Sequence, residues 1–185
     1  PPHGDGFMVV DANLGAWKTD HAIDRSYTYR VRPSEDGSYE GELRVRYEHN
    51  GSFDWRTTRY RSYSRIYLPE DATVIDVEGF RDPKNPSLEV PDDRGKREGF
   101  QILGGYVRIS PGESQELTAR YILPPEVQKN IKKGLYTFSV QKQIGLIDPE
   151  LTIDLDFGKT IGPSGAESYT ETRPLREDYS LELKL

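Results

Sequence analysis

Large apolar residues alternate with polar residues along two neighbouring segments of the chain, 23–32 and 39–48. Side chains that alternate in this way lie on opposite faces of a β-strand, so one face of each strand is expected in a core and the other in water. The expected inward residues are Ile23, Tyr27, Tyr29 and Val31 in the first segment, and Tyr39, Leu43, Val45 and Tyr47 in the second.

The connection between these segments predicts how the two strands pair. If residues 35–37 form a three-residue loop, Gly37 supplies the left-handed conformation that such a loop requires. Opposite charges then meet on one face and apolar side chains on the other, and each pair contributes about 0.2–1 kcal/mol. The charges of this hairpin are therefore expected to serve one another and the surrounding water. The predicted pairs are Arg32 with Glu40, Arg30 with Glu42, and Tyr29 with Leu43.

Further strands are predicted at short intervals, separated by glycine- and proline-containing turns. The expected segments are 60–68, 73–79, 100–110, 114–123, 135–144, 151–157 and 179–185. No helices alternate with them, which favours an all-β fold. The sequence therefore predicts a single domain over residues 1–185, an antiparallel β-sandwich that is immunoglobulin-like in architecture.

At most one short helix is predicted, near residues 125–133 in the sequence PPEVQKNIKKG. Pro125 suits the first helical position and Gly134 suits the cap after the last turn. Val127 and Ile131 share one face, which is expected to pack against the core.

Two segments are expected outside the regular structure. Residues 1–6, at the start of PPHGDGF, are expected to be irregular. Residues 81–97 hold three prolines and nine charged residues, which predicts a long surface loop between two strands. Leu88 and Val90 are its only sizeable apolar residues, and we expect them to anchor its middle.

The composition excludes several classes of function. The formal net charge is −6, and general binding to nucleic acid or to an anionic membrane requires a positive surface. The chain contains no cysteine, which excludes disulfides, thiolate metal sites and cysteine catalysis. No apolar run approaches the ~20 residues that span a bilayer, and no signal peptide is present, so any anchor of the parent protein is expected outside this chain.

Several segments resemble, in order, a known bacterial family. They are VVDANLGAWKTD (9–20), YRSYSRIYLPEDATVIDVEGF (60–80), ELTARYILP (116–124) and YTFSVQKQIG (136–145). Together they resemble the C-terminal part of the family catalogued as domain of unknown function 4012, over roughly residues 7–158. Ser64 and Ile144 depart from the family pattern, and PPEVQKNIKKG is an insertion.

The resemblance implies a location rather than an activity. Proteins of this family are large envelope proteins, with a membrane helix near the N-terminus and most of the chain outside the cytoplasm. The family has no assigned activity, so no catalytic residue follows from it. Its ANLG-x-x-KTD and QKQ-x-G motifs correspond here to Asn13, Lys18, Asp20, Gln141, Lys142 and Gln143.

These motif residues also have structural interpretations. Asn13 suits a tight turn, and Asp20 is expected to cap the turn or to pair with Lys18. In the second motif the two glutamines are expected to point outward. Lys142 is expected at the inward end of its strand, where an ion pair with an acid of the 13–20 segment is one alternative.

No catalytic site and no resident cofactor are predicted. The three histidines, at positions 3, 21 and 49, have no metal-ligand spacing and no serine motif nearby, and the last two are expected in separate strands. Calcium is retained as a weak alternative because two segments are rich in oxygen ligands. These ligands are Asp82, Asn85, Asp92 and Asp93 in one segment, and Asp11, Asn13, Asp20 and Asp24 in the other.

The segment WRTTRYRSYSRIY (55–67) combines four arginines with four aromatic residues and no acid. If the apolar residues at 66 and 68 point inward, its other residues form an outward ladder. The rings and guanidinium groups can stack on one another, at ~0.5–1 kcal/mol per exposed contact, or they can bind a glycan or an acidic partner. Single-stranded nucleic acid uses the same residue types, but the acidic charge argues against it. The candidate interaction surface is Trp55, Arg61, Tyr63, Arg65 and Tyr67.

The sequence therefore predicts a non-catalytic extracytoplasmic module of a membrane-anchored bacterial envelope protein, acting as a spacer or in adhesion. Its expected partner is a cell-envelope protein or a glycan, with no nucleic acid, and with membrane contact only through an anchor outside this chain. One alternative is a glycan-binding module that uses Trp55, Tyr63 and Tyr67. Another is a hydrolase whose carboxylates converge only in three dimensions.

Overall fold

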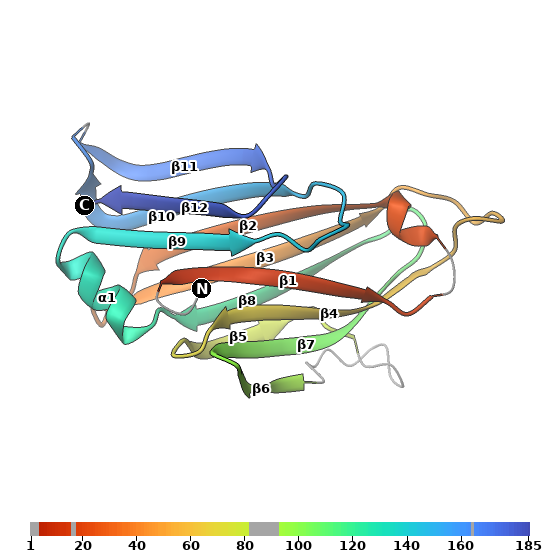
Figure 1. Cartoon of the computed structure of the whole chain (residues 1–185), viewed down its shortest axis with the longest axis horizontal. Helices are drawn as coiled ribbons and strands as arrows, with labels where there is room; N and C mark the ends of the chain where they lie inside the picture. The colour runs from red at the N-terminus through yellow and green to blue at the C-terminus, as the bar shows by residue number, and fades with distance from the viewer. Residues whose placement is uncertain (1–3, 16–17, 82–92, 164) are drawn as a thin grey trace.

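A computed structural model of the chain describes residues 4–15, 18–81, 93–163 and 165–185. Two six-stranded β-sheets enclose one hydrophobic core, as expected for a sandwich-like all-β fold (Figure 1). The first sheet has the order β12-β9-β1-β4-β7-β6, and the second has the order β11-β10-β2-β3-β8-β5.

The strands of the first sheet are β1 (Asp5–Asn13), β4 (Tyr60–Pro69), β6 (Asp93–Arg97), β7 (Phe100–Ile109), β9 (Leu135–Gln141) and β12 (Tyr179–Lys184). Those of the second are β2 (Ile23–Pro33), β3 (Tyr39–His49), β5 (Thr73–Glu78), β8 (Ser114–Ile122), β10 (Glu150–Ile161) and β11 (Ala166–Pro174). A 3-10 helix, η1 (Thr19–Ala22), follows β1, and α1 (Pro125–Lys132) connects β8 to β9.

The sheets are mixed, so the prediction of a purely antiparallel sandwich is wrong. The strands β1, β4, β7 and β6 pair antiparallel, and so do β2, β3, β8 and β5. However, β9 joins β1 in parallel, and β10 joins β2 in parallel. Side chains alternate with a period of two in both kinds of pair, so the pattern of the sequence does not distinguish them.

The β2–β3 hairpin confirms the predicted register. Gly37 has a φ of 80°, and its N–H donates to the Ser34 carbonyl oxygen at 3.0 Å. The outward charges also reach the next strand, because Arg32 Nη2 lies 2.5 Å from Asp154 Oδ2 of β10. The predicted pairs Arg32–Glu40, Arg30–Glu42 and Tyr29–Leu43 are all present.

The predicted helix is confirmed by α1, which packs against β9. Val127 and Ile131 are buried on its inner face, and Gly134 follows it with a φ of 89°. Among the described residues, no helix is long and apolar enough to cross a membrane.

The core is rich in tyrosine. Tyrosine hydroxyl groups that are buried need hydrogen-bond partners, and here they find them in two polar centres inside the sandwich. One centre surrounds Asp5 at the start of β1, and the other surrounds Arg25 near the start of β2. The fully buried tyrosines are Tyr29, Tyr47, Tyr60, Tyr121 and Tyr136.

Asp5 and Gly6, expected in an irregular start, begin β1 instead. The Asp5 carboxylate is fully buried, and its oxygens accept hydrogen bonds from the Gly6 N–H at 2.9 Å, from Tyr121 at 3.1 Å, from Tyr136 at 2.5 Å and from Tyr29. Burial raises the pKa of Asp5, and the hydroxyl groups act in the opposite direction. The tyrosines that donate to Asp5 come from distant strands, so nothing next to it in the sequence indicates that it is buried. The polar, glycine-containing start therefore resembles a linker in sequence.

Gly41 provides the space for this centre. It occupies an inward position of β3, where the alternation places larger residues. A Cβ at this position would lie 2.8 Å from the Tyr121 ring and 2.9 Å from the Tyr29 hydroxyl oxygen. Packing therefore requires the glycine here.

Part of the predicted surface loop 81–97 is a strand. Asp93–Arg97 form β6, which pairs with β7 at the edge of the first sheet, and Arg81 makes an isolated bridge to Tyr106. An edge strand whose described side chains are exposed shows no alternation that would identify it. Residues 82–92, which include the expected anchors Leu88 and Val90, lie outside the described residues.

The hydrophobic pattern does not predict β11 either, because its residues are largely exposed and polar on both faces. This strand nevertheless joins the edges of the two sheets. Glu171 Oε2 accepts hydrogen bonds from the hydroxyl groups of Tyr169 at 2.5 Å and of Tyr179, in β12, at 2.6 Å. The Arg173 guanidinium carbon lies 4.6 Å from the centre of the Tyr179 ring.

Candidate functional site

Three connecting segments, which follow β1, β3 and β9, lie together at the end of the sandwich opposite α1 (Figure 1). The Leu14 N–H donates to the Arg61 carbonyl oxygen, and the Asn50 N–H donates to the Ala22 carbonyl oxygen, both at 2.9 Å. These hydrogen bonds tie the first segment to β4 and the second segment to the first. We call them the loop end, defined as residues 14–15, 18–22, 50–59 and 142–149.

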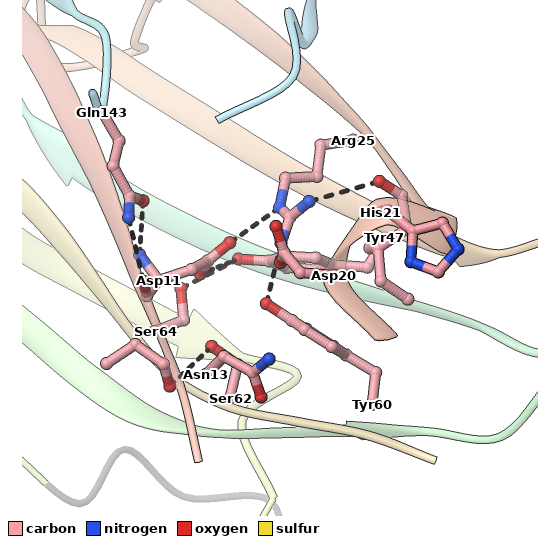
Figure 2. Close-up of polar contacts among 12 residues, drawn as sticks. Asp11, Asn13, Asp20, His21, Arg25, Tyr47, Tyr60, Ser62, Ser64 and Gln143 are labelled. Carbon is pink, nitrogen blue, oxygen red and sulfur yellow. Dashed lines mark hydrogen bonds and ion pairs between the residues drawn. The ribbon is translucent and has the colours of Figure 1, made fainter. Parts of the chain in front are cut away.

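Beneath the loop end, the buried side chain of Arg25 binds two carboxylates (Figure 2). Its Nε lies 2.8 Å from Asp11 Oδ2 in β1, and its Nη2 lies 2.5 Å from Asp20 Oδ1 in η1. Nη2 also donates to the Tyr60 hydroxyl oxygen at 2.7 Å, and Nη1 donates to the Ile23 carbonyl oxygen at 3.2 Å. The side chains of Arg25 and Asp11 are 2% and 3% exposed, whereas that of Asp20 is 37% exposed.

Aromatic and hydroxyl groups complete this cluster. The Arg25 guanidinium carbon lies 5.6 Å from the centre of the Tyr47 ring and 5.4 Å from that of Tyr60. The Tyr47 hydroxyl donates to Asp11 Oδ1 at 2.9 Å and lies 2.9 Å from Ser64 Oγ. The buried charges are thus paired and hydrogen-bonded, as burial of an ion pair requires.

The electrostatics keep the cluster in one protonation state. Burial lowers the pKa of Arg25, but the carboxylates of Asp11 and Asp20 outweigh burial and leave that pKa above its usual value. Burial also raises the pKa values of Tyr47 and Tyr60. Arg25 therefore stays a cation and both tyrosines stay neutral near neutral pH, which makes these three groups unsuitable as general acids or bases.

The two motifs of the family resemblance meet at this cluster (Figure 2). The Gln143 side chain binds the backbone of Asp11, with Oε1 accepting from the N–H at 2.7 Å and Nε2 donating to the carbonyl oxygen at 2.9 Å. Asp20 of the first motif binds Arg25 rather than Lys18, which corrects the predicted pairing. Asn13 Oδ1 accepts from the Gly15 N–H at 2.9 Å, in the expected tight turn.

The Lys142 side chain makes its contacts within its own loop, so the alternative of an ion pair with the 13–20 segment is wrong. Its Nζ donates to the Leu146 carbonyl oxygen at 2.7 Å and lies 3.7 Å from Asp148 Oδ1. The strand ends at Gln141, which is exposed as expected. Gln143 therefore leaves the alternation of β9 and turns back to β1 instead of pointing outward.

Arg25 itself is not predicted as a site residue, although the sequence contains a signal for it. It lies between Ile23 and Tyr27 on the inward side of β2, where the alternation favours an apolar residue. A charged residue at an inward position implies a buried partner of opposite charge. The sequence does not indicate which of the many carboxylates that partner is.

The loop end carries most of the exposed large apolar side chains. Of the six such side chains in the described part of the chain, only Ile75, in β5, lies elsewhere. The guanidinium carbons of Arg56 and Arg59 lie 5.5 Å and 5.8 Å from the ring centres of Trp55 and Phe53. The exposed fractions are 56% for Leu14, 62% for Phe53, 81% for Trp55, 98% for Ile144 and 61% for Ile147.

The outward ladder predicted on β4 is present, whereas Trp55 belongs to the loop end. The Arg65 guanidinium carbon lies 4.7 Å from the centre of the Tyr63 ring, so cation and ring stack as one of the interpretations expects. Tyr63 also packs edge-on against Tyr106 of β7, with ring centres 5.1 Å apart. The residues of β4 that point away from the core are Arg61, Tyr63, Arg65 and Tyr67.

Among the described residues, no group of three or more histidines and acids could hold a metal ion. The oxygens of Asp11, one of the calcium candidates, are bound by Arg25 and Tyr47. Asp24 Oδ2 accepts a hydrogen bond from Asn50 Nδ2 at 2.6 Å. The candidates at 82, 85 and 92 lie outside the described residues, and the side chain of residue 93 is not described.

The two described histidines lie apart and make backbone contacts. His21 is in η1, not in a strand as expected, and its Nδ1 contacts the Lys18 carbonyl oxygen. His49 is buried at the end of β3, with Nε2 2.8 Å from the Thr58 carbonyl oxygen and Nδ1 accepting from the Gly51 N–H at 3.1 Å. His49 therefore braces both arms of the loop that carries the exposed aromatic residues.

No family model matches the chain, and no curated protein matches it. The family resemblance given above therefore stays a prediction. Among solved structures, the fold is similar to that of a Legionella pneumophila protein described as a "putative nutrient binding protein", with a TM-score of 0.55 and 8% sequence identity. The similarity covers 98% of this chain and 71% of that chain, and at this identity it shows a common fold alone.

Proposed function

We propose that this chain is a non-catalytic binding module of a membrane-anchored bacterial envelope protein, and that it acts in adhesion outside the cytoplasm. Its contact surface is the loop end, and its partner is a cell-envelope protein that presents an apolar surface. The observation that carries the proposal is the gathering of exposed apolar side chains on three loops above a well-ordered polar cluster.

The apolar side chains supply the binding energy. Burial of apolar surface contributes about 25 cal/mol per Å², and the loop end exposes more than half of five large side chains. Tryptophan is among the residues that most often dominate protein interfaces, and Trp55 is the more exposed of the two aromatic residues here. A spacer that only separates other domains has no need of such a surface.

The hydrogen bonds beneath the loops favour binding because they order the loops in advance. Gln143 ties the β9–β10 loop to β1, Arg25 ties η1 to β2 through Asp20, and His49 braces the β3–β4 loop. An ordered loop loses less conformational entropy when a partner binds.

The location outside the cytoplasm rests on the family resemblance, and the Legionella protein's description agrees with a binding type of module. We also propose that the sandwich is immunoglobulin-like, in keeping with chain connections that cross repeatedly between its two sheets. One feature weighs against the hydrolase alternative. Asp11 and Asp20, the carboxylates brought together here, both bind Arg25 and so do not form a hydrolytic acid–base pair.

Binding to isolated cell envelopes of the bacterium that encodes the protein tests the proposal. We expect the chain to bind saturably to untreated envelopes and not to protease-treated envelopes. The double variant Trp55→Ala/Ile144→Ser should weaken binding at least about tenfold without a change in melting temperature, because both side chains are highly exposed. Ile75→Ser is the control, since it removes an exposed apolar side chain in β5. Wild-type affinity in the double variant, or unchanged binding after protease treatment, would contradict the proposal.

A further inference from the structure

A second surface adjoins the loop end at Arg59 and carries three arginines, Arg59, Arg61 and Arg108, that form no ion pair with a described carboxylate. Arg61 of β4 and Arg108 of β7 lie directly opposite each other in the antiparallel register, on the outer face of the first sheet. Both are exposed, and neither has a carboxylate within ion-pair distance among the described residues. Arg59, also exposed, lies next to them on the same side, where its Nε donates to Ser110 Oγ at 3.4 Å.

This pairing is unfavourable for the fold. Like charges placed directly opposite each other destabilise a sheet. The outer face of the second sheet avoids the problem by alternating arginines with acids. There, Arg32 lies 2.5 Å from Asp154, and Arg44 lies 2.8 Å from Glu42. The chain has 31 acidic and 25 basic residues, so an unneutralised group of arginines is not a result of general basic composition.

One acid close enough to be affected by this group, Glu113, is already engaged. Glu113 accepts a hydrogen bond from the Ser110 N–H at 2.8 Å, and this bond, with a smaller contribution from Arg59, lowers its pKa. Glu113 therefore carries its charge, but it lies beyond ion-pair distance of the arginine. A local positive surface attracts an anion, whereas the acidic remainder of the protein repels it. The net attraction is therefore greatest for an anion that is compact or sparsely charged.

Aromatic rings continue the surface along the strands. The pair Tyr63–Tyr106 is the next outward pair after Arg61–Arg108, and Arg65 follows it over the Tyr63 ring. Successive outward side chains of a strand are about 7 Å apart, so charged and aromatic positions alternate over a distance of several sugar units. Guanidinium groups bind carboxylates through paired hydrogen bonds, and a tyrosine ring offers an apolar edge and a hydroxyl group to a sugar.

We propose that this surface, defined as Arg59, Arg61, Tyr63, Arg65, Tyr106 and Arg108, binds an acidic polysaccharide whose sugar units carry carboxylate groups at intervals. Nucleic acid fits it less well, because its phosphates are closely spaced and would extend over the acidic remainder of the protein. The proposal does not rest on the proposed function: the two surfaces meet at Arg59, which lies over the Phe53 ring, but Trp55 and Ile144 take no part in this one.

The experiment compares the binding of oligogalacturonate, as the acidic probe, with that of uncharged dextran oligomers and single-stranded DNA, by calorimetric titration. Arg108→Glu places opposite charges across the β4–β7 pair, so it should keep or raise the melting temperature while weakening oligogalacturonate binding at least about tenfold. Lys184→Glu, which changes an exposed side chain of β12 in the same sheet, makes the same change in net charge and should bind as the wild type does.

The outcomes separate this proposal from the previous one. Trp55→Ala/Ile144→Ser should bind oligogalacturonate normally even if it fails to bind envelopes. No binding of oligogalacturonate, equal affinity in Arg108→Glu, or equal affinity for dextran would overturn the proposal. Tighter binding of single-stranded DNA would also overturn it, and would assign the surface to nucleic acid.

Discussion

Replacing Arg25 with methionine tests whether the polar cluster holds the loop end in place. The variant keeps much of the side-chain volume but removes the cation, which leaves the Asp11 carboxylate, 3% exposed, with Tyr47 as its side-chain donor. Removing one partner of a buried ion pair costs about 3–5 kcal/mol, because the other charge stays buried without compensation. Asp20 is 37% exposed and can be rehydrated, so its lost contact adds little.

We therefore expect the free energy of unfolding to fall by about 3–5 kcal/mol, a large part of the roughly 5–15 kcal/mol that such domains have. For a chain of this size the melting temperature should fall by about 6–20 °C. Urea unfolding followed by circular dichroism measures the loss, provided that the slope with urea stays unchanged. In the double variant Arg25→Met/Asp11→Asn neither charge remains, so part of the loss should be recovered, with a coupling energy of about 1–3 kcal/mol.

Two results would refute this reasoning. A loss below about 1 kcal/mol in Arg25→Met would show that the pair behaves as a hydrated surface contact. A double variant whose loss equals the sum of the two single losses would show that Arg25 and Asp11 do not interact in the folded protein.

Two further predictions concern Asp5 and Gln143. Because burial raises the pKa of Asp5, the folded state keeps that proton to a higher pH than the unfolded state, and the free energy of unfolding should fall as the pH rises above the usual carboxyl pKa. Asp5→Asn should remove this contribution, a decrease in the free energy of unfolding of at most about 1.4 kcal/mol per pH unit, and urea unfolding at several pH values measures it. A wild-type free energy of unfolding that rises with pH relative to that of Asp5→Asn would contradict the assignment. Gln143→Ala should lower the free energy of unfolding by about 1–2 kcal/mol and speed hydrogen exchange at the Asp11 amide. The exposed control Gln141→Ala should do neither, and unchanged exchange in Gln143→Ala would show that the contact is not formed.

The parts of the fold that the sequence predicts correctly depend on local information. In the β2–β3 hairpin, the position of Gly37 and the alternation on either side specify the loop, the register and the buried face together. The helix is similarly local, since Pro125 and Gly134 mark its ends within a single short segment. Alternation likewise places the rings and arginines of β4 on its outer face.

The parts that the sequence does not predict depend on distant partners. Nothing near Asp5 indicates that the hydroxyl groups of Tyr29, Tyr121 and Tyr136 will surround it, so its polar neighbourhood resembles a linker. Arg25 is recognisable as an exception to the alternation, but its pairing with Asp11 depends on how two sheets face each other. The direction in which β9 and β10 join the sheets leaves no trace in a two-residue period.

The two parallel pairs also affect when the protein can fold during its synthesis. Phe7 pairs with Val140, and Tyr27 pairs with Leu151, so β1 and β2 obtain their last neighbours only after the much later strands β9 and β10 have been synthesised. Contacts so distant in sequence slow folding, because a long loop must close before any of them forms. Until then, β1 and β2 each present an unpaired edge that other nascent chains can extend. This part of the growing chain therefore depends on β9 and β10, or on a chaperone, to stay out of aggregates.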